Sequence, residues 1–268
     1  MYRPSKRLSY IDRGKALAIM SVVFGHVGLF CFYGFGVDIS HLRIMHFTGI
    51  FQMPLFMFLS GLVVSCRPIK IQGVEFDLKK RFRTLIVPFG VIGGMYSIFC
   101  SGKDYLQFLQ QNEKLGYWYL WALFVMYLLH YIYEFLLLPK IDNKWCDICF
   151  GAMVAMGLAL LNRIMPSNVA NLLSWSNIAT LYPYFYLGVM VKKYNLQKLL
   201  LNNNIVWAIS VITCLIFITK QSIFVSWTIS YKLFSLVMII FCLNPLYSIM
   251  SGGGENWKTI RLYRATHT

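Results

Sequence analysis

Long stretches of the chain carry no Asp, Glu, Lys or Arg, among them five runs of 19 to 23 residues. Crossing the hydrocarbon of a bilayer as a helix takes about 20 apolar residues, because every backbone polar group must be satisfied within the segment. The five stretches are residues 16–37, 44–66, 84–102, 115–133 and 199–219. They predict membrane-spanning helices.

Three shorter or interrupted runs bring the predicted number of spans to about eight. They are residues 148–162, 178–191 and 222–247, the last with Lys232 inside it. Only 13% of the chain is charged, whereas a soluble domain carries about 25%. The predicted fold class is therefore all-α: a polytopic transmembrane helical bundle in the cell (inner or plasma) membrane. Residues 1–250 are expected to form a single transmembrane domain, followed by a short basic tail at 251–268.

The distribution of basic residues predicts the orientation of the bundle. With a cytoplasmic N-terminus, 17 Lys and Arg residues fall on the cytoplasmic side and five on the opposite side. An excess of basic residues in cytoplasmic loops is typical of membrane proteins, so both termini are expected in the cytoplasm. The same distribution explains the formal net charge of +15 without a nucleic-acid partner.

No metal site is expected from the cysteines. Cys146 and Cys149 form a CxxC pattern, but no second pair accompanies them. Reduced thiols at a helix end therefore explain the pattern better than metal or redox chemistry. The first apolar run is predicted to be a retained span, because it is too long for a signal peptide and no small-residue cleavage site follows it.

The first apolar run carries ionisable residues on one face. Lys15 and His26 are 11 residues apart, which places them within roughly 20° around a helix and about 16 Å apart along its axis. Asp12 lies some 40° from this stripe by the same geometry, about 100° per residue. Ionisable residues within a span usually face the bundle interior. From the residues alone, a structural histidine and a functional one are equally supported.

A basic cluster precedes the third long apolar run on its cytoplasmic side. It consists of Lys79, Lys80, Arg81 and Arg83. Anionic lipid headgroups alone would explain it. A ligand with several phosphates would need the same cluster, because guanidinium groups pair bidentately with phosphate oxygens. Taken by itself, the cluster favours lipid.

Five segments stand in a distinctive order and spacing: LSYIDRGKALAIMSVVFGHV, FQMPLFMFLSG, KKRFRTLIVPF, YWYLWALF and YPYFYLGVMVKK. They resemble the acyltransferase-3 family of integral membrane proteins over about residues 7–195. The most specific match is a basic residue followed after ten residues by a histidine, which Lys15 and His26 provide. The next is a pair of basic residues with two between them, Lys80 and Arg83, although the family more often has Arg at the first position.

The resemblance implies a membrane-embedded O-acyltransferase that moves acetyl from cytoplasmic acetyl-CoA to a hydroxyl of a cell-surface or lipid-linked glycan. It implies that His26 is the base for the hydroxyl proton, since an imidazole exchanges protons near neutral pH. Asp12 would orient Lys15 at the cytoplasmic end of the same helix. Expected partners are membrane lipid, the acyl-CoA donor, the glycan acceptor and polysaccharide assembly machinery.

The resemblance also implies binding residues. Lys80, Arg81 and Arg83 would hold the phosphates of acetyl-CoA, which acts as a co-substrate and not as a permanently bound cofactor. Gln52 and Trp118 would contact the substrate. Gln52 stands where the family often has a histidine, so it can position a group by hydrogen bonding but cannot usefully exchange protons near neutrality.

Family members usually have more spans than this chain, and the tail GGGENWKTIRLYRATHT imitates the start of a further one. Arg261 and Arg264 would be costly inside lipid, so the last spans are expected to be lacking. Two alternatives stay open. One is a transporter or flippase for a lipid-linked sugar, since broken helices and buried ionisable residues also mark substrate paths. The other is an inactive, truncated relative that acts as an assembly partner.

Overall fold

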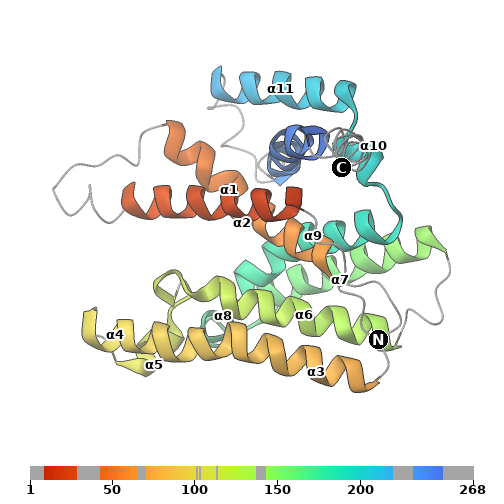
Figure 1. Ribbon diagram of the computed structural model, residues 1–268. Coiled ribbons are helices and arrows are strands. Elements are labelled where there is room, and N and C mark those ends of the chain that lie inside the picture. The colour runs from red at the N-terminus through yellow and green to blue at the C-terminus, as the bar shows by residue number, and fades with distance from the viewer. Residues whose placement is uncertain are drawn as a thin grey trace, which may run out of the picture. The chain divides into compact units, whose positions relative to one another are not determined.

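The computed structural model describes residues 9–28, 43–64, 71–100, 102, 104–112, 114–136, 143–219 and 232–249 (Figure 1). Within these residues all regular secondary structure is helical and no strand occurs. The predicted all-α class is confirmed for this part of the chain.

The α-helices are α1 (Ser9–His26), α2 (Arg43–Val63), α3 (Ile71–Arg81), α4 (Gly94–Cys100), α5 (Tyr105–Gln110), α6 (Trp118–Leu136), α7 (Lys144–Ile164), α8 (Ser167–Leu173), α9 (Trp175–Lys193), α10 (Gln197–Leu201) and α11 (Asn204–Thr219). A further helix covers Lys232–Ile249. Two π-helical turns, η2 (Phe82–Ile86) and η3 (Phe89–Gly93), join α3 to α4, and a 3₁₀ turn, η4 (Lys114–Gly116), precedes α6. Residues 71–100 therefore form one continuous helical segment, called here the 71–100 helix.

Three helices among the described residues are long and apolar enough to cross a membrane: Phe76–Phe99, Lys144–Ile164 and Lys232–Ile249. Two shorter apolar helices cover Thr48–Val63 and Asn204–Ile216. Every apolar run singled out in the sequence overlaps a helix. The chain therefore has the helices of a membrane protein, while the count of eight spans and their orientation stay predictions.

The chain divides into two compact units. Unit 1 contains Met1–Val63 and Val191–Thr268, and unit 2 contains Val64–Met190. The single domain predicted over residues 1–250 stays a prediction, and the tail at 251–268 lies outside the described residues.

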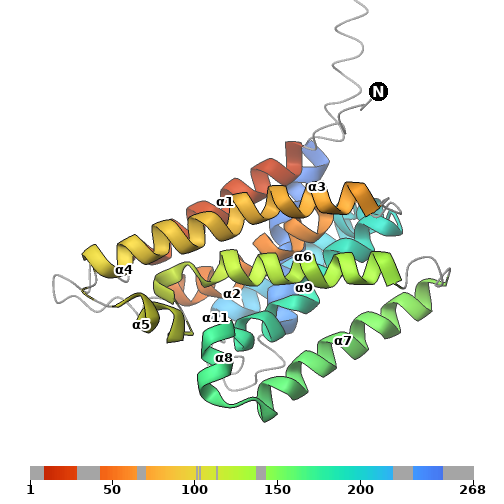
Figure 2. The ribbon, with the colours of Figure 1, turned by 90° about the horizontal axis from the view of Figure 1, so that it is seen from below.

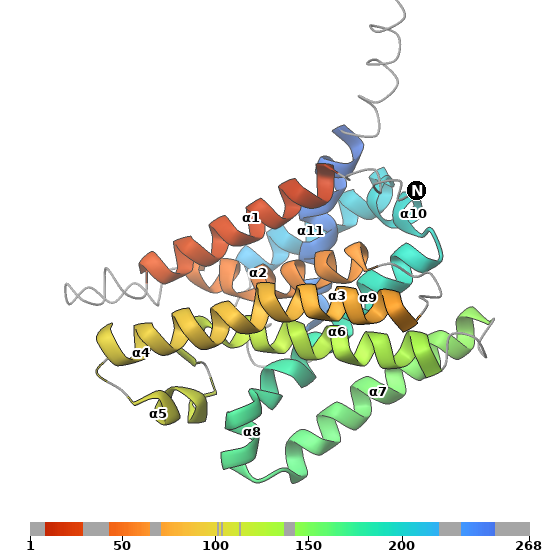
Figure 3. The same ribbon diagram turned by 60° about the horizontal axis from the view of Figure 1, so that its bottom comes forward.

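Unit 1 is built on the pairing of α1 with α2 (Figure 3). Gly14 on α1 permits this close approach, because a Cβ there would lie 2.9 Å from a Leu243 methyl group and 3.0 Å from Leu59. The helix Lys232–Ile249 is joined to α2 by a buried hydrogen bond in which Ser235 Oγ donates to the Ile50 carbonyl at 3.0 Å. These contacts fix the first helix, which carries His26, against the second.

Unit 2 is built on the 71–100 helix, which lies beside α6 (Figures 1 and 2). The ring of Phe89 packs 5.5 Å from that of Phe108 and 6.1 Å from that of Trp121, measured between centroids. On the other side of α6, Tyr133 stacks on Phe150 of α7 at 5.4 Å. Aromatic packing therefore fixes the position of the 71–100 helix, which carries the basic cluster, relative to α6.

The turn before α6 is held by a buried lysine. Lys114, Leu115 and Gly116 all have positive φ, at 42°, 50° and 91°, a region that only glycine adopts freely. Lys114 is 1% exposed, and its ammonium donates to the carbonyls of Gln111 at 2.9 Å and Asn171 at 2.7 Å. Burial lowers the pKa of Lys114 to about 8. The two carbonyls offset part of the cost of burying the charge.

Candidate active site

The predicted site residues fall into two groups, one in each unit. Unit 1 holds Asp12, Lys15, His26 and Gln52, and unit 2 holds Lys80, Arg81, Arg83 and Trp118.

The helix α1 carries the three predicted catalytic residues without a break, from its first turn to its last residue. Asp12 is exposed in the first turn, where a carboxylate favours the positive end of the helix dipole. Lys15 is half-buried, and its Nζ lies 5.9 Å from the centroid of the Phe56 ring on α2, at the outer limit of a cation–π contact. His26 ends the helix with an exposed side chain.

Gln52 lies beside the end of α1 that carries His26. The position of a Cβ on Gly25 is 3.7 Å from Gln52 Oε1 and 4.0 Å from Nε2, so the glycine leaves room for the amide. Gln52 Oε1 is buried and accepts no hydrogen bond from the described residues. Leaving a buried acceptor unpaired is costly. The oxygen is therefore available to accept a hydrogen bond from a ligand or from a neighbouring group at this place.

Trp118 opens α6 and is half-buried. Trp121 on the next turn is anchored, because its Nε1 donates to the Leu173 carbonyl at 2.9 Å. The substrate contact predicted for Trp118 stays a prediction.

The basic cluster has three exposed members and one that is held in place. Lys79, Lys80 and Arg83 are exposed, whereas the Arg81 side chain is only 21% exposed. The π-helical turn η2 begins directly after Arg81, and Thr84 Oγ1 lies 3.0 Å from the Lys80 carbonyl oxygen and 3.3 Å from that of Arg81. Single π-turns inside α-helices are frequent at functional sites.

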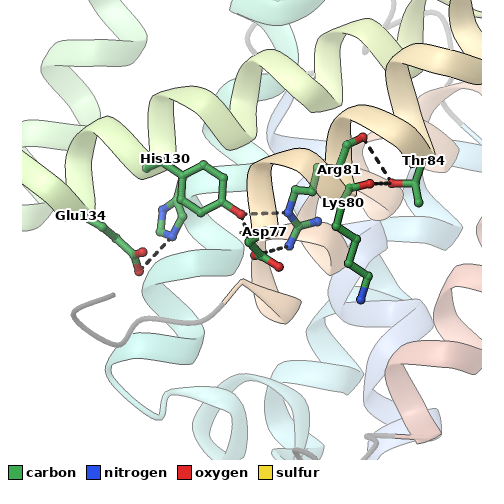
Figure 4. Close-up of polar contacts among 7 residues, drawn as sticks. Asp77, Lys80, Arg81, Thr84, His130 and Glu134 are labelled. Atoms are coloured by element: carbon green, nitrogen blue, oxygen red, sulfur yellow. Dashed lines mark hydrogen bonds and ion pairs between the residues drawn. The ribbon is translucent and has the colours of Figure 1, made fainter. Parts of the chain in front are cut away.

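The Arg81 guanidinium is engaged by side chains of its own helix and of α6 (Figure 4). Its Nε donates to Tyr131 Oη at 3.0 Å, and Tyr131 Oη donates to Asp77 Oδ2 at 2.7 Å. Arg81 Nη2 lies 3.7 Å from the same carboxylate oxygen. The Tyr127 ring covers one face of the guanidinium, with Arg81 Cζ 3.5 Å from the ring centroid.

Sequence reasoning missed these partners. Asp77 and Arg81 are spaced i,i+4 on one helix, a spacing typical of helical ion pairs that could have been recognised. Tyr131 is 50 residues from Arg81 in sequence, and no local pattern indicates that contact.

A second polar group, His130 and Glu134, also lies on α6 and is shown in Figure 4. His130 Nε2 is 3.1 Å from Glu134 Oε1, and their side chains are 1% and 3% exposed. Asp147 on α7 joins this helix to both α6 and α9. Tyr133 of α6 donates to Asp147 Oδ1 at 2.6 Å, and Tyr186 of α9 donates to the Asp147 carbonyl at 2.8 Å. The apolar run at 115–133 ends just before Glu134, so the buried pair was not predicted.

A comparison with known protein families identifies the family of this chain. The acyltransferase-3 model, described as an acyltransferase domain, matches residues 8–261. No curated protein and no solved structure matches the chain significantly. The match covers nearly the whole sequence and extends through both units, and it confirms the resemblance found in the five segments. Together with the long apolar helices, it shows that the chain belongs to the acyltransferase-3 family of membrane acyltransferases.

Proposed function

We propose that this protein transfers acetyl from cytoplasmic acetyl-CoA to a hydroxyl of a cell-surface or lipid-linked glycan in the cell membrane. The observation that carries the proposal is the cationic cluster Lys80, Arg81 and Arg83, which lies at the start of an apolar helix in a chain of this family. Coenzyme A carries a diphosphate and a ribose phosphate, and charge-assisted hydrogen bonds from Arg and Lys suit both groups.

His26 supplies the base in this proposal. The acceptor oxygen attacks the thioester carbonyl carbon, the carbon–sulfur bond breaks, and coenzyme A leaves as the thiol after taking up the proton that the hydroxyl lost. An imidazole is suited to accept and return that proton, and general-base catalysis contributes about 10²- to 10⁴-fold. The Gln52 amide oxygen lies beside the same helix end and accepts no hydrogen bond from the described residues, which supports a positioning role for Gln52.

The remaining predicted residues have supporting roles in this proposal. Asp12 and Lys15 lie on the first two turns of α1, so they would act at its cytoplasmic end, with the carboxylate orienting the ammonium. Trp118 would contact the acceptor, since aromatic faces pack well against sugar rings and other apolar surfaces.

The test is transfer of label by the full-length protein in lipid vesicles. Acetyl-CoA labelled in its acetyl group is supplied on the cytoplasmic side together with glycan from cells that lack the protein. Label should appear on the glycan as an ester that mild alkali releases as acetate. Glycan acetylation that is the same in cells with and without the protein, together with no transfer in vesicles, would overturn the proposal.

A further inference from the structure

The Arg81 guanidinium is held by two tyrosines of α6 and stays partly exposed. Arginine has five N–H donors in one plane, and here Nε–H is used by Tyr131 while the Tyr127 ring covers one face. The side chain nevertheless remains 21% exposed. The guanidinium is therefore held in place while part of the Arg81 side chain stays accessible.

The Tyr131 hydroxyl bridges the Arg81 guanidinium and the Asp77 carboxylate. It accepts from Arg81 and donates to Asp77, and Tyr131 is only 6% exposed, so its ring has little freedom to move. The direct distance from Arg81 Nη2 to Asp77 Oδ2 is 3.7 Å, beyond hydrogen-bonding range. The two Nη groups are therefore oriented by the carboxylate but not saturated by it.

We infer that Tyr131 and Asp77 are positioning residues that orient Arg81 to bind a phosphate group of the acyl-CoA donor; the inference rests on the proposed function. A flexible arginine loses side-chain entropy when it binds an anion, and holding it in place beforehand reduces that loss. Lys80 and Arg83, both exposed, flank Arg81 in sequence and supply further cations for the same ligand. Tyr131 acts through Arg81 and touches no reacting atom.

A purely structural role for the same contacts predicts different behaviour. If Tyr131 only joined the 71–100 helix to α6, its loss would lower the amount of folded protein without changing donor affinity. If it orients Arg81, its loss raises the KM for acetyl-CoA while kcat at saturating donor stays nearly constant, because the affected interaction is binding and not the chemical step.

The experiment compares Tyr131→Phe with Tyr133→Phe in purified full-length protein. Both variants remove one buried hydroxyl from α6, but the Tyr133 hydroxyl donates to Asp147 Oδ1 on α7, whereas the Tyr131 hydroxyl accepts from Arg81. The loss of a hydrogen bond to a charged group costs enough free energy to lower a binding affinity about tenfold. Tyr131→Phe should therefore raise the KM for acetyl-CoA by about tenfold, and Tyr133→Phe should leave it within about twofold of the wild-type value while lowering thermal stability.

A double-mutant cycle with Arg81→Ala decides between the roles. If Tyr131 acts through Arg81, adding Tyr131→Phe to Arg81→Ala should raise the donor KM no further. If Arg81→Ala raises the donor KM but Tyr131→Phe does not change it, this inference is overturned, while the proposed donor site is still supported. An equal rise in both backgrounds also overturns it. If the Lys80, Arg81, Arg83 triple alanine variant binds acetyl-CoA as well as wild type, the proposed donor site itself is wrong.

Discussion

His26 is the last residue of α1 and shares that end of the helix with the Gln52 amide on α2. A histidine that serves only to join helices would be needed for folding, whereas a histidine that accepts a proton would be needed for turnover. The two roles can be separated because glutamine keeps a hydrogen-bonding end of similar size without a usable basic nitrogen.

His26→Gln should fold and lose at least about 10²-fold in turnover. The measurement is the rate per folded molecule, with detergent-solubilised protein quantified by gel filtration. Gln52→Ala serves as the comparison, since a positioning residue should affect the rate less than the base does. A well-folded His26→Gln variant that retains more than about a tenth of the activity would disprove the base assignment, because loss of a general base lowers the rate by more than tenfold.

Lys114 gives a prediction about pH. Burial lowers its pKa to about 8 from a usual 10.5, so the folded protein binds fewer protons than the unfolded chain between these values. Stability must then rise with pH across that window, and the cost of burying the charge is fully present below it. The thermal midpoint of wild type relative to Lys114→Met should therefore increase from about pH 8 to pH 10.5. A difference that stays constant or falls over this range would contradict the buried-lysine assignment.

At the scale of the element, α7 and α9 meet through a glycine. Gly151 lies directly against the Tyr186 ring, whose hydroxyl donates to the Asp147 carbonyl one turn earlier on α7. A Cβ at Gly151 would collide with the ring, and the ring cannot move without losing its buried hydrogen bond. The contact sets how closely the two helices approach.

Gly151→Ala is expected to destabilise the protein by about 1–3 kcal/mol, the usual cost of overpacking. Gly157→Ala is the matched control, because it lies on the same helix and, among the described residues, no atom beyond its chain neighbours and its own helix backbone is within 4 Å of the added Cβ. The control should be neutral or more stable by up to about 1 kcal/mol, since alanine favours helix over glycine. Thermal unfolding in detergent measures both. Equal midpoints for the two variants would show that the α7–α9 contact is looser than described.

At the scale of the whole molecule, the family match and the apolar helices establish a membrane acyltransferase, and the distribution of basic residues predicts its orientation. Cys146 and Cys149 are exposed at the start of α7, a segment predicted to face the cytoplasm. Their accessibility therefore reports on which side of the membrane that helix begins.

In a variant that keeps only Cys146 and Cys149, a membrane-impermeant maleimide added to intact cells should label neither thiol. Permeabilised cells should be labelled, because both side chains are exposed. The control is a cysteine introduced at Lys103, which the basic-residue count places on the opposite side. Labelling of the α7 thiols in intact cells would reverse the predicted orientation.

Much of this could be predicted from the sequence because it depends on local composition. A run such as 44–66 is apolar whatever surrounds it. In lipid no water can bond the backbone N–H and C=O groups, so a single apolar segment crosses the membrane as a helix, which satisfies these groups internally. The spacing of Lys15 and His26 on one helix likewise follows from helical geometry, and the family resemblance depends only on the order of residues. The all-α class and the family are confirmed on these grounds.

The tertiary structure decided how the polar residues are partnered. In the sequence Arg81 is one member of a basic cluster, whereas in the structure its guanidinium donates to Tyr131, which lies 50 residues away on α6. The Lys114 ammonium is buried and donates to the Asn171 carbonyl, 57 residues away. Contacts between residues distant in sequence depend on which helices pack together and at what rotation, and no local pattern encodes that. The sequence by itself determined which segments are helical and apolar, and only their packing determined which ionisable groups meet.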